Sequence, residues 1–250
     1  MSTRDLTGRV AFVSGASRGI GAGIAQRFAA RGMKLVLCSR TPPVLPDSED
    51  VLSVSLDVRD EAGMNGLIAK AEERFGGIDL FINNAGVLEP IAPIRDVSVE
   101  AFAEHLEVNL VGVFVGSRCY VEHLRRVGRG GVLINISSGA ASKAYHGWGA
   151  YCAAKAGVER LTEVIALEEA EIGLRAHAVA PGVVDTDMQS LIRATPAEKF
   201  PETLRFQEKK VDGAFNRAEF VADELAALAF DPTREGSPVV LRLPDEWGET

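Results

Sequence analysis

The chain has 250 residues, of which 46% are hydrophobic and 25% charged, and its 27 basic and 35 acidic residues give a formal net charge of −8. This composition is close to the average of globular domains and excludes collagen-like, low-complexity and disulfide-scaffold chains. The negative charge also argues against nucleic acid as a partner, because phosphate backbones are bound by basic surfaces.

Several kinds of site and segment are missing from the sequence. The three cysteines form no C-x-x-C pair, and the four histidines form no H-E-x-x-H pattern, so no metal site is expected. The N-terminal residues lack the apolar core of a secretory signal, and no apolar run approaches the roughly 20 residues that a membrane span requires. We therefore expect a cytoplasmic protein that acts neither on nucleic acid nor in a membrane.

Short apolar runs alternate with longer amphipathic segments along the chain. Each short run is apolar on both faces rather than on one, which is typical of parallel strands covered by helices. Strands are predicted at Arg9–Ser14, Lys34–Ser39, Val51–Leu56, Ile78–Asn83, Gly131–Ile136, Leu174–Ala180 and Pro238–Leu243. Helices are predicted at Ile20–Arg31, Glu61–Phe75, Val99–Arg126 and Ala150–Ile172. The succession predicts an α/β fold, a Rossmann-like doubly wound parallel sheet of about seven strands with helices on both faces.

The domain organisation is expected to be simple. No linker rich in Pro, Gly or Ser divides the chain, so residues 1–250 should form a single domain. The proline-rich stretch Thr41–Pro46 joins two predicted strands at a point where a helix would normally stand. Residues 186–215 interrupt the regular alternation after the strand that ends at Ala180. Because ligands of open α/β sheets bind beyond the carboxyl ends of the strands, we expect residues 186–215 to form a substrate lid.

The first predicted strand runs directly into a glycine-rich turn that opens a helix. Glycines let the chain turn sharply and bring backbone N–H groups close to a pyrophosphate, and the helix start adds partial positive charge. Such a turn alone is weak evidence, but the strand–turn–helix context predicts dinucleotide binding. The expected cofactor contacts here are Gly15, Ser17, Arg18, Gly19, Ile20 and Gly21.

The end of the second strand indicates which dinucleotide binds. An NAD site usually carries a carboxylate there for the ribose 2′-hydroxyl, whereas an arginine accommodates the 2′-phosphate of NADP. This chain has Arg40 at that point and no acidic residue before Asp47. Arg18 is a second cation within reach, although two solvated arginines are the alternative. The pattern favours NADP, and Asp57 is a candidate acceptor for the adenine amino group.

A second group of residues predicts catalysis. Ser138 follows a strand, and Tyr151-Cys-Ala-Ala-Lys155 comes thirteen residues later. Tyr151 and Lys155 share one helical face, and an ammonium beside a phenol favours the phenolate, so we expect Lys155 to lower the pKa of Tyr151. Ser138 would hydrogen-bond the substrate oxygen as its charge changes. A lone Y-x-x-x-K also arises by chance, but its position after a serine-bearing strand favours the catalytic interpretation.

In order and spacing, these motifs resemble the short-chain dehydrogenase/reductase family over nearly the whole chain. The matching motifs are Gly15–Gly21, Asp57-Val58, Asn83-Asn84-Ala85-Gly86, Asn109, Ser138, Tyr151-x-x-x-Lys155 and Pro181-Gly182. The resemblance implies a catalytic dinucleotide-binding domain in which hydride passes between nicotinamide C4 and a carbonyl carbon. It further implies that Tyr151 is the proton donor and that Lys155 holds the nicotinamide ribose.

The same resemblance assigns the remaining cofactor contacts. It implies that Asn109, in a helix, anchors a water relay leading to Lys155. It places Asn84 near the adenosine half of the cofactor and makes Asp57 and Val58 cofactor contacts as well. It places Val184 and Thr186 at the nicotinamide end.

Two departures from the family pattern indicate which members of the family the chain resembles most. The helix between the second and third strands is missing, and the usual Gly-Gly pair near the C-terminus is replaced by Val239–Trp247. The segment Pro181–Gln189 is similar to that of sepiapterin reductase and of benzil reductases, which reduce dicarbonyls or side-chain ketones with NADPH. The expected activity is NADPH-dependent reduction of a small α-dicarbonyl, diaryl diketone or pterin side-chain ketone. The alternatives are a broad-range alcohol dehydrogenase of the same family and a non-catalytic NADP-sensing regulatory protein.

The expected substrate contacts surround Ser138. Tyr145 and Trp148 would stack on a flat substrate, with ordinary loop packing as the alternative, and Gly182 would leave room against its backbone. In sepiapterin reductases a C-terminal aspartate anchors the pterin, and Asp245 is the nearest candidate here.

The resemblance also predicts the oligomeric state. Family members favour dimers or tetramers built on two long helices, which correspond here to Val99–Arg126 and Ala150–Ile172. A homodimer or homotetramer is therefore expected.

Overall fold

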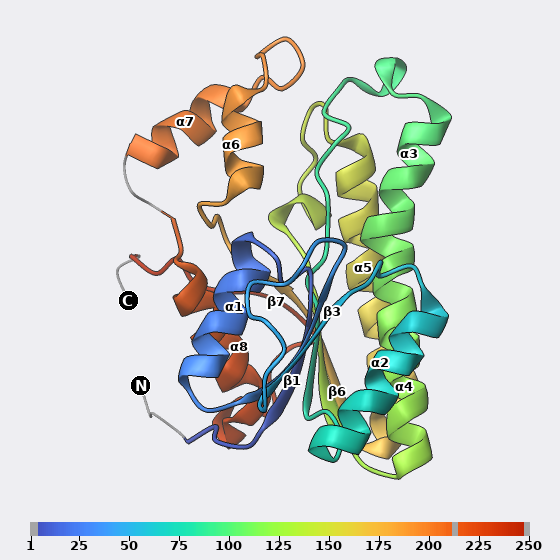
Figure 1. Ribbon diagram of the computed structural model, residues 1–250. Coiled ribbons are helices and arrows are strands. Elements are labelled where there is room, and N and C mark those ends of the chain that lie inside the picture. The colour runs from blue at the N-terminus through green and yellow to red at the C-terminus, as the bar shows by residue number, and fades with distance from the viewer. Residues whose placement is uncertain (1–4, 212–214, 248–250) are drawn as a thin grey trace.

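Parallel strands form a single seven-stranded sheet in the computed structural model, which describes residues 5–211 and 215–247 (Figure 1). The strands are β1 (Val10–Ser14), β2 (Lys34–Ser39), β3 (Val51–Ser55), β4 (Leu80–Asn83), β5 (Gly131–Ile136), β6 (Leu174–Ala180) and β7 (Val240–Arg242). Their order is β3-β2-β1-β4-β5-β6-β7, so the winding reverses between β1 and β4. The predicted Rossmann-like sheet is confirmed, and ligands of such sheets bind at this reversal.

Helices cover both faces of the sheet, because alternate strand residues point to opposite sides. In β1, Ala11 and Val13 pack with α1 and α8, whereas Val10 and Phe12 pack with α2, α4 and α5. Figure 1 shows these two helical layers on either side of the strands. The helices are α1 (Gly19–Ala30), α2 (Glu61–Phe75), α3 (Val99–Leu106), α4 (Gly112–Val127), α5 (Gly149–Glu168), α6 (Asp187–Ala194), α7 (Thr203–Val211) and α8 (Ala218–Phe230).

Aromatic rings form the centre of the α2–α4–α5 layer. Phe12 and Phe81 stack with ring centroids 4.1 Å apart, and Phe81 stacks in turn on Tyr120. The buried Tyr120 hydroxyl donates a hydrogen bond to the carbonyl of Ile78 over 3.1 Å. This core fixes the strands whose carboxyl ends carry the site.

The structure differs from the sequence expectations at three helices. The predicted helix Val99–Arg126 is interrupted by a wider π-helical turn at Glu107–Val111. The predicted helix Ala150–Ile172 gives way after Glu168 to a short 3₁₀ turn. The sequence does not indicate helix α8, because the segment is apolar on most sides and lacks a clear amphipathic period. No helix stands between β2 and β3, as the prolines there predicted.

The segment predicted to be a lid contains α6 and α7, drawn in orange beyond the strand ends in Figure 1. Its two ends meet: Val184 pairs with Asn216, and the N–H of Asn216 donates to the carbonyl of Val183 over 2.8 Å. The expected lid includes residues 212–214, and the expected domain includes both chain ends, all of which lie outside the described residues.

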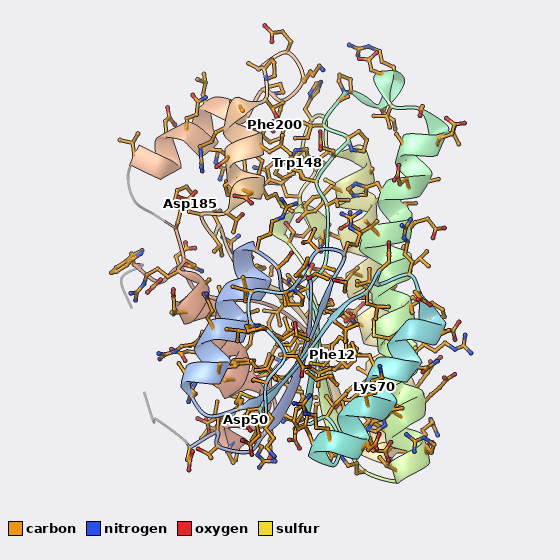
Figure 2. All side chains as sticks on the ribbon, viewed as in Figure 1. Phe12, Asp50, Lys70, Trp148, Asp185 and Phe200 are labelled. Atoms are coloured by element: carbon orange, nitrogen blue, oxygen red, sulfur yellow. The ribbon has the colours of Figure 1, made fainter. Side chains whose placement is uncertain are left out.

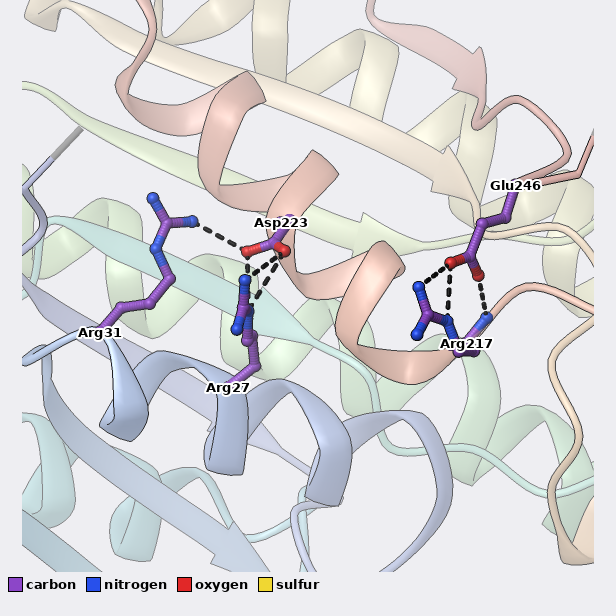
Figure 3. A network of polar contacts seen from close by, with 5 residues as sticks. All are labelled: Arg27, Arg31, Arg217, Asp223 and Glu246. Carbon is purple, nitrogen blue, oxygen red and sulfur yellow. Dashed lines mark hydrogen bonds and ion pairs between the residues drawn. The ribbon is translucent and has the colours of Figure 1, made fainter. Parts of the chain in front are cut away.

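Ion pairs join α8 to its neighbours (Figure 3). The carboxylate of Asp223 accepts hydrogen bonds from Arg27 at 2.8–3.1 Å and from Arg31 at 3.0 Å, which ties α8 to α1. At the start of α8, Arg217 pairs with Glu246 of the C-terminal segment. No helix within the described parts of the chain has the length and apolar character needed to cross a bilayer.

Candidate active site

A cavity of about 700 Å³ opens at the carboxyl ends of the strands. It brings together almost all of the predicted site residues. Those lining it are Gly15, Ser17, Arg18, Gly19, Ile20, Arg40, Asp57, Val58, Asn84, Asn109, Ser138, Tyr145, Trp148, Tyr151, Lys155, Gly182, Val184 and Thr186. Two candidates are absent from the lining, Gly21 and Asp245.

The glycine turn between β1 and α1 forms one wall. Gly15 has a φ of +68°, and a Cβ there would lie 2.8 Å from the Cα of Ala85, so only glycine fits. Helix α1 then starts without a side-chain cap from Arg18 and without an acidic residue in its first turn. Its first N–H groups are therefore left for an external anion, which fits the pyrophosphate of a dinucleotide.

Gly21 is not part of the cavity lining, and its expected contact with the cofactor stays a prediction. Gly21 lies behind the turn, where a Cβ would collide with the carbonyl oxygen of Gly15. The residue is thus needed for close packing of the turn on α1. Gly19, in contrast, lines the cavity with a φ of +58° and lies against Thr186, the first residue of the expected lid.

The end of β2 offers a cation and no carboxylate. Ser39, Arg40 and Thr41 line the cavity there, and Arg40 forms no ion pair with the described residues. The next acidic residue along the chain, Asp47, instead pairs with Arg74 over 3.3 Å. This wall therefore carries a positive charge that faces the cavity without a salt bridge to any described residue.

The carboxylate of Asp57, two residues after β3, already has a hydrogen-bonding partner within the protein. Its two carboxylate oxygens accept hydrogen bonds from the Arg59 guanidinium at 3.0 and 2.7 Å. These bonds are the main cause that lowers the pKa of Asp57, and the charge of Arg40 lowers it further. The Asp57 carboxylate thus stays ionised beside Arg40.

Arg18, the second predicted cation, lies across the mouth of the cavity. Its side chain is 75% exposed and is 3.7 Å from Asp187 at the start of α6.

Asn84 stabilises the glycine turn. Its side-chain amide donates hydrogen bonds to the carbonyls of Ser14 and Gly15 over 2.9 and 3.3 Å.

The predicted catalytic residues converge from β5 and α5. Tyr151 and Lys155 are buried on one face of α5, at 8% and 4% exposure. Ser138, just beyond β5, accepts a hydrogen bond from the N–H of Ala140 over 3.2 Å, which fixes its hydroxyl. The Lys155 ammonium donates to the carbonyl of Ile136 over 2.7 Å and lies 5.7 Å from the centre of the Tyr151 ring.

The expected lowering of the Tyr151 pKa is wrong for the cofactor-free protein. Burial raises the pKa of Tyr151, and the hydrogen bond with Ser138 only partly opposes this. Burial likewise lowers the pKa of Lys155 to about 8. Both shifts favour the neutral forms, because a buried site penalises charge.

Asn109 lies inside the π-helical turn, where the sequence predicted an ordinary helix. It is fully buried, its Nδ2 donates to the carbonyl of Val87 over 2.9 Å, and its Oδ1 accepts from the N–H of Val87 over 3.0 Å. These bonds lock the side chain, so any water relay would have to use other atoms of this turn.

Aromatic side chains line the catalytic end of the cavity, where the ring centroids of Tyr145 and Trp148 lie 4.9 Å apart. Behind this aromatic lining, Trp148 stacks on Phe200, which is not part of the cavity lining (Figure 2). Phe206 lines the cavity and lies tilted against the same indole. Neither phenylalanine is among the predicted site residues. Their only sequence signal is their position inside the segment predicted to cover the site. Met188, Leu191 and Ile192 of α6 complete an apolar lining.

The expected substrate roles of Gly182 and Asp245 stay predictions. Gly182 lines the cavity with a φ of +77°, and a Cβ there would lie 2.7 Å from Nδ2 of Asn216, so the position suits glycine. Asp245 lies 3.7 Å from Arg242, outside the cavity lining. Among the described residues, no cluster of His, Cys, Asp or Glu is arranged to hold a metal.

A family model described as short chain dehydrogenase matches residues 9–197. The chain belongs to the short-chain dehydrogenase/reductase family. This assignment also makes it an oxidoreductase of alcohol and carbonyl groups that uses a nicotinamide dinucleotide.

Similar proteins agree with this family. The chain is 34% identical to 2-(R)-hydroxypropyl-CoM dehydrogenase of Xanthobacter autotrophicus, over 85% of this chain and 89% of that protein. It is 33% identical to a benzil reductase of Bacillus cereus that forms (S)-benzoin, over 88% and 93%. The ligand-free structure of Thermoplasma acidophilum aldohexose dehydrogenase superposes with a TM-score of 0.81 at 28% identity, covering 96% and 93% of the two chains.

Within this short-chain dehydrogenase/reductase, the residues present fit a dinucleotide. The uncapped start of α1 suits a pyrophosphate, and the buried Tyr151 and Lys155 with the apolar residues around them suit a nicotinamide.

Proposed function

We propose that the protein is an NADPH-dependent carbonyl reductase for small flat ketones: an α-dicarbonyl, a diaryl diketone or a pterin side-chain ketone. One observation carries the proposal. A single cavity joins Arg40, which forms no salt bridge with the described residues, at one end to Ser138, Tyr151 and the aromatic side chains at the other. The similarity to a benzil reductase supports the same substrate class.

The sheet order sets the separation of the two ends. Arg40 follows β2 and Ser138 follows β5, which are three strand spacings apart. At about 4.8 Å per spacing this is roughly 14 Å. Such a span, across the reversal between β1 and β4, is where doubly wound sheets bind a dinucleotide.

The chemistry follows from the protonation states of the site. A bound nicotinamide supplies or accepts the hydride. Because burial raises the pKa of Tyr151, its hydroxyl keeps its proton at neutral pH and is available to donate it to a carbonyl oxygen. Ser138 holds the same oxygen by a hydrogen bond. Lys155 binds the ribose hydroxyls, and its ammonium group places a positive charge beside the phenol of Tyr151.

Cofactor choice is tested at Arg40. A guanidinium pairs well with a 2′-phosphate, so Arg40→Asp should raise the KM for NADPH by at least about tenfold, with little effect on the KM for NADH. Arg95→Asp is the matched control, since Arg95 is exposed and outside the cavity. Equal changes for both cofactors in the Arg40 variant would contradict NADP preference.

Substrate class is tested with purified protein and NADPH on benzil, diacetyl and sepiapterin. NADPH consumption on at least one of these compounds is expected. Oxidation of many simple alcohols with no reduction of these ketones would favour a broad-range alcohol dehydrogenase. NADPH binding with no turnover of any carbonyl would favour a regulatory protein.

A second copy of this chain is the proposed partner. The outer faces of α4 and α5 carry exposed apolar side chains, including Phe114 at 46% and Leu167 at 82% exposure. Burying them would stabilise a homodimer or homotetramer. Sedimentation of wild type and of Leu167→Glu distinguishes this from a monomer, because the charged variant should dissociate.

A further inference from the structure

His105 is a buried residue of α3 that the chemistry described above does not use. It is 1% exposed and lies one helical turn before Asn109, at the point where α3 meets the π-helical turn. Residues four apart share a helical face, so the imidazole points to the same side as the Asn109 amide. Three of its neighbours belong to the site: Asn109, Tyr151 and the segment after β4.

The hydrogen bonds of His105 assign its tautomer. Its Nδ1 lies 2.7 Å from the carbonyl oxygen of Glu89, which can only accept, so Nδ1 carries the hydrogen. The Nε2 of the neutral ring is then an acceptor. It lies 2.8 Å from Nδ2 of Asn109, which donates to it.

The Asn109 amide needs this acceptor. One Nδ2 hydrogen goes to the carbonyl of Val87 and the other to His105, while Oδ1 accepts from the N–H of Val87. A Cβ on Gly86 would lie 2.7 Å from Oδ1, so the amide fits closely between the strand end and the helix. Without His105, a fully buried N–H would have no partner.

The ring of His105 also supports Tyr151. The two ring centroids are 6.0 Å apart and the planes are inclined by 82°, an edge-to-face contact. Tyr151 comes from α5, whereas Glu89 and Val87 follow β4. One imidazole therefore contacts both the element that carries the phenol and the segment that holds Asn109.

We propose that His105 is a positioning residue of the active site: as the neutral Nδ1–H tautomer it orients the Asn109 amide and the Tyr151 ring. It touches neither cofactor nor substrate and acts only through these two residues. The groups that face it are Tyr151 and Lys155 from α5 and the Glu89 carbonyl. Burial is the main cause that lowers the pKa of His105, and Lys155 lowers it further, against the Glu89 hydrogen bond, so the ring stays neutral.

Two variants separate the two hydrogen bonds. In His105→Asn, the amide nitrogen can replace Nδ1 and keep the bond to Glu89, but nothing accepts from Asn109. In His105→Gln, the side-chain oxygen can reach the position of Nε2 and keep the bond to Asn109. We expect kcat to fall at least about tenfold in His105→Asn and to stay within about threefold of wild type in His105→Gln, with the KM for NADPH unchanged in both.

The control is His177→Asn. His177 is also buried, with Nδ1 3.0 Å from the carbonyl of Pro238, but its Nε2 has no partner among the described residues. Its variant should keep the wild-type kcat. Equal kcat losses in both His105 variants, or a wild-type kcat in His105→Asn, would overturn the proposal.

The kinetic arm rests on the proposed function, so a second arm uses wild-type protein without substrate. Imidazole ¹⁵N and ¹³C chemical shifts at pH 7 should show His105 as the neutral Nδ1–H tautomer. An Nε2–H tautomer or a charged ring would overturn the proposal even if the variants failed to fold. Failure of the carbonyl reductase assignment would instead appear as absent turnover with the expected tautomer intact.

Discussion

The indole of Trp148 stacks on the ring of Phe200, with centroids 4.6 Å apart and planes inclined by 12°. Trp148 immediately precedes α5, three residues before Tyr151, whereas Phe200 lies between α6 and α7. Gly147 permits the approach, because a Cβ there would collide with the carbonyl of Lys199. The segment expected to form the lid is thus held directly against the start of the helix that carries Tyr151.

Phe200→Leu should weaken this contact. Phe200 is fully buried, and loss of ring contacts typically costs about 1–2 kcal/mol. We expect the KM for an aromatic diketone to rise several-fold while the KM for NADPH stays unchanged. Phe28→Leu, in the buried core of α1, is the control and should lower the Tm without changing either KM. An unchanged KM for the ketone in Phe200→Leu would show that the contact between Phe200 and Trp148 does not contribute to substrate binding.

The pH dependence of turnover should reflect a protonated phenol. Since burial raises the pKa of Tyr151, the hydroxyl stays protonated through neutral pH, and ketone reduction should vary little between pH 6 and 8. Alcohol oxidation needs the phenolate and should rise with pH over the same range. Tyr151→Phe should lower both rates by at least about a hundredfold and still bind NADPH. A variant that kept most of its rate would contradict the role of Tyr151 as proton donor.

Lys155→Met should stabilise the cofactor-free protein and abolish turnover. The folded-state pKa of Lys155 is about 8, below its ordinary value of 10.5, so burying the charge costs about 3 kcal/mol at pH 7, partly offset by the bond to Ile136. Between these pKa values the unfolded chain binds more protons. Wild-type stability should therefore rise from pH 8 to 10 relative to the variant. Urea unfolding at several pH values measures this, with the exposed Lys70→Met as the control.

Asp223→Asn should test the ion pairs that join α1 and α8 (Figure 3). The Asp223 side chain is partly exposed and pairs with both Arg27 and Arg31. Solvent screening limits the expected loss to about 1 kcal/mol, and added salt should shrink it. Activity should be unchanged, because Asp223 lies outside the cavity. A loss that is independent of salt would indicate a packing effect instead.

Sequence reasoning predicted the sheet well because buried parallel strands are short, apolar and separated by helical patterns. It placed the start of α1 and the absence of a helix before β3 from glycines and prolines, which restrict the backbone directly. It did not predict the π-helical turn at Glu107–Val111, since the contacts that hold Asn109 come from Val87, far away in sequence.

The site was predictable where it follows strand ends and unpredictable where it depends on tertiary contacts. Ser138, Tyr151 and Lys155 line one cavity as their spacing indicated. His105 carries no motif, and its importance depends on neighbours 4, 16 and 46 residues away along the chain. At Gly21 the motif predicts a ligand contact, whereas the structure shows a packing requirement, because a Cβ there would collide with the carbonyl oxygen of Gly15.

The pairing of Val184 with Asn216 gives the lid a closed base. Because the two ends of the segment are fixed together beside β6, a change in its length or sequence need not disturb the strands that hold the catalytic groups. Residues between these anchors can therefore be exchanged as a cassette. Grafting the equivalent segment of another family member is expected to transfer its choice of ketone while leaving the cofactor preference of this chain intact.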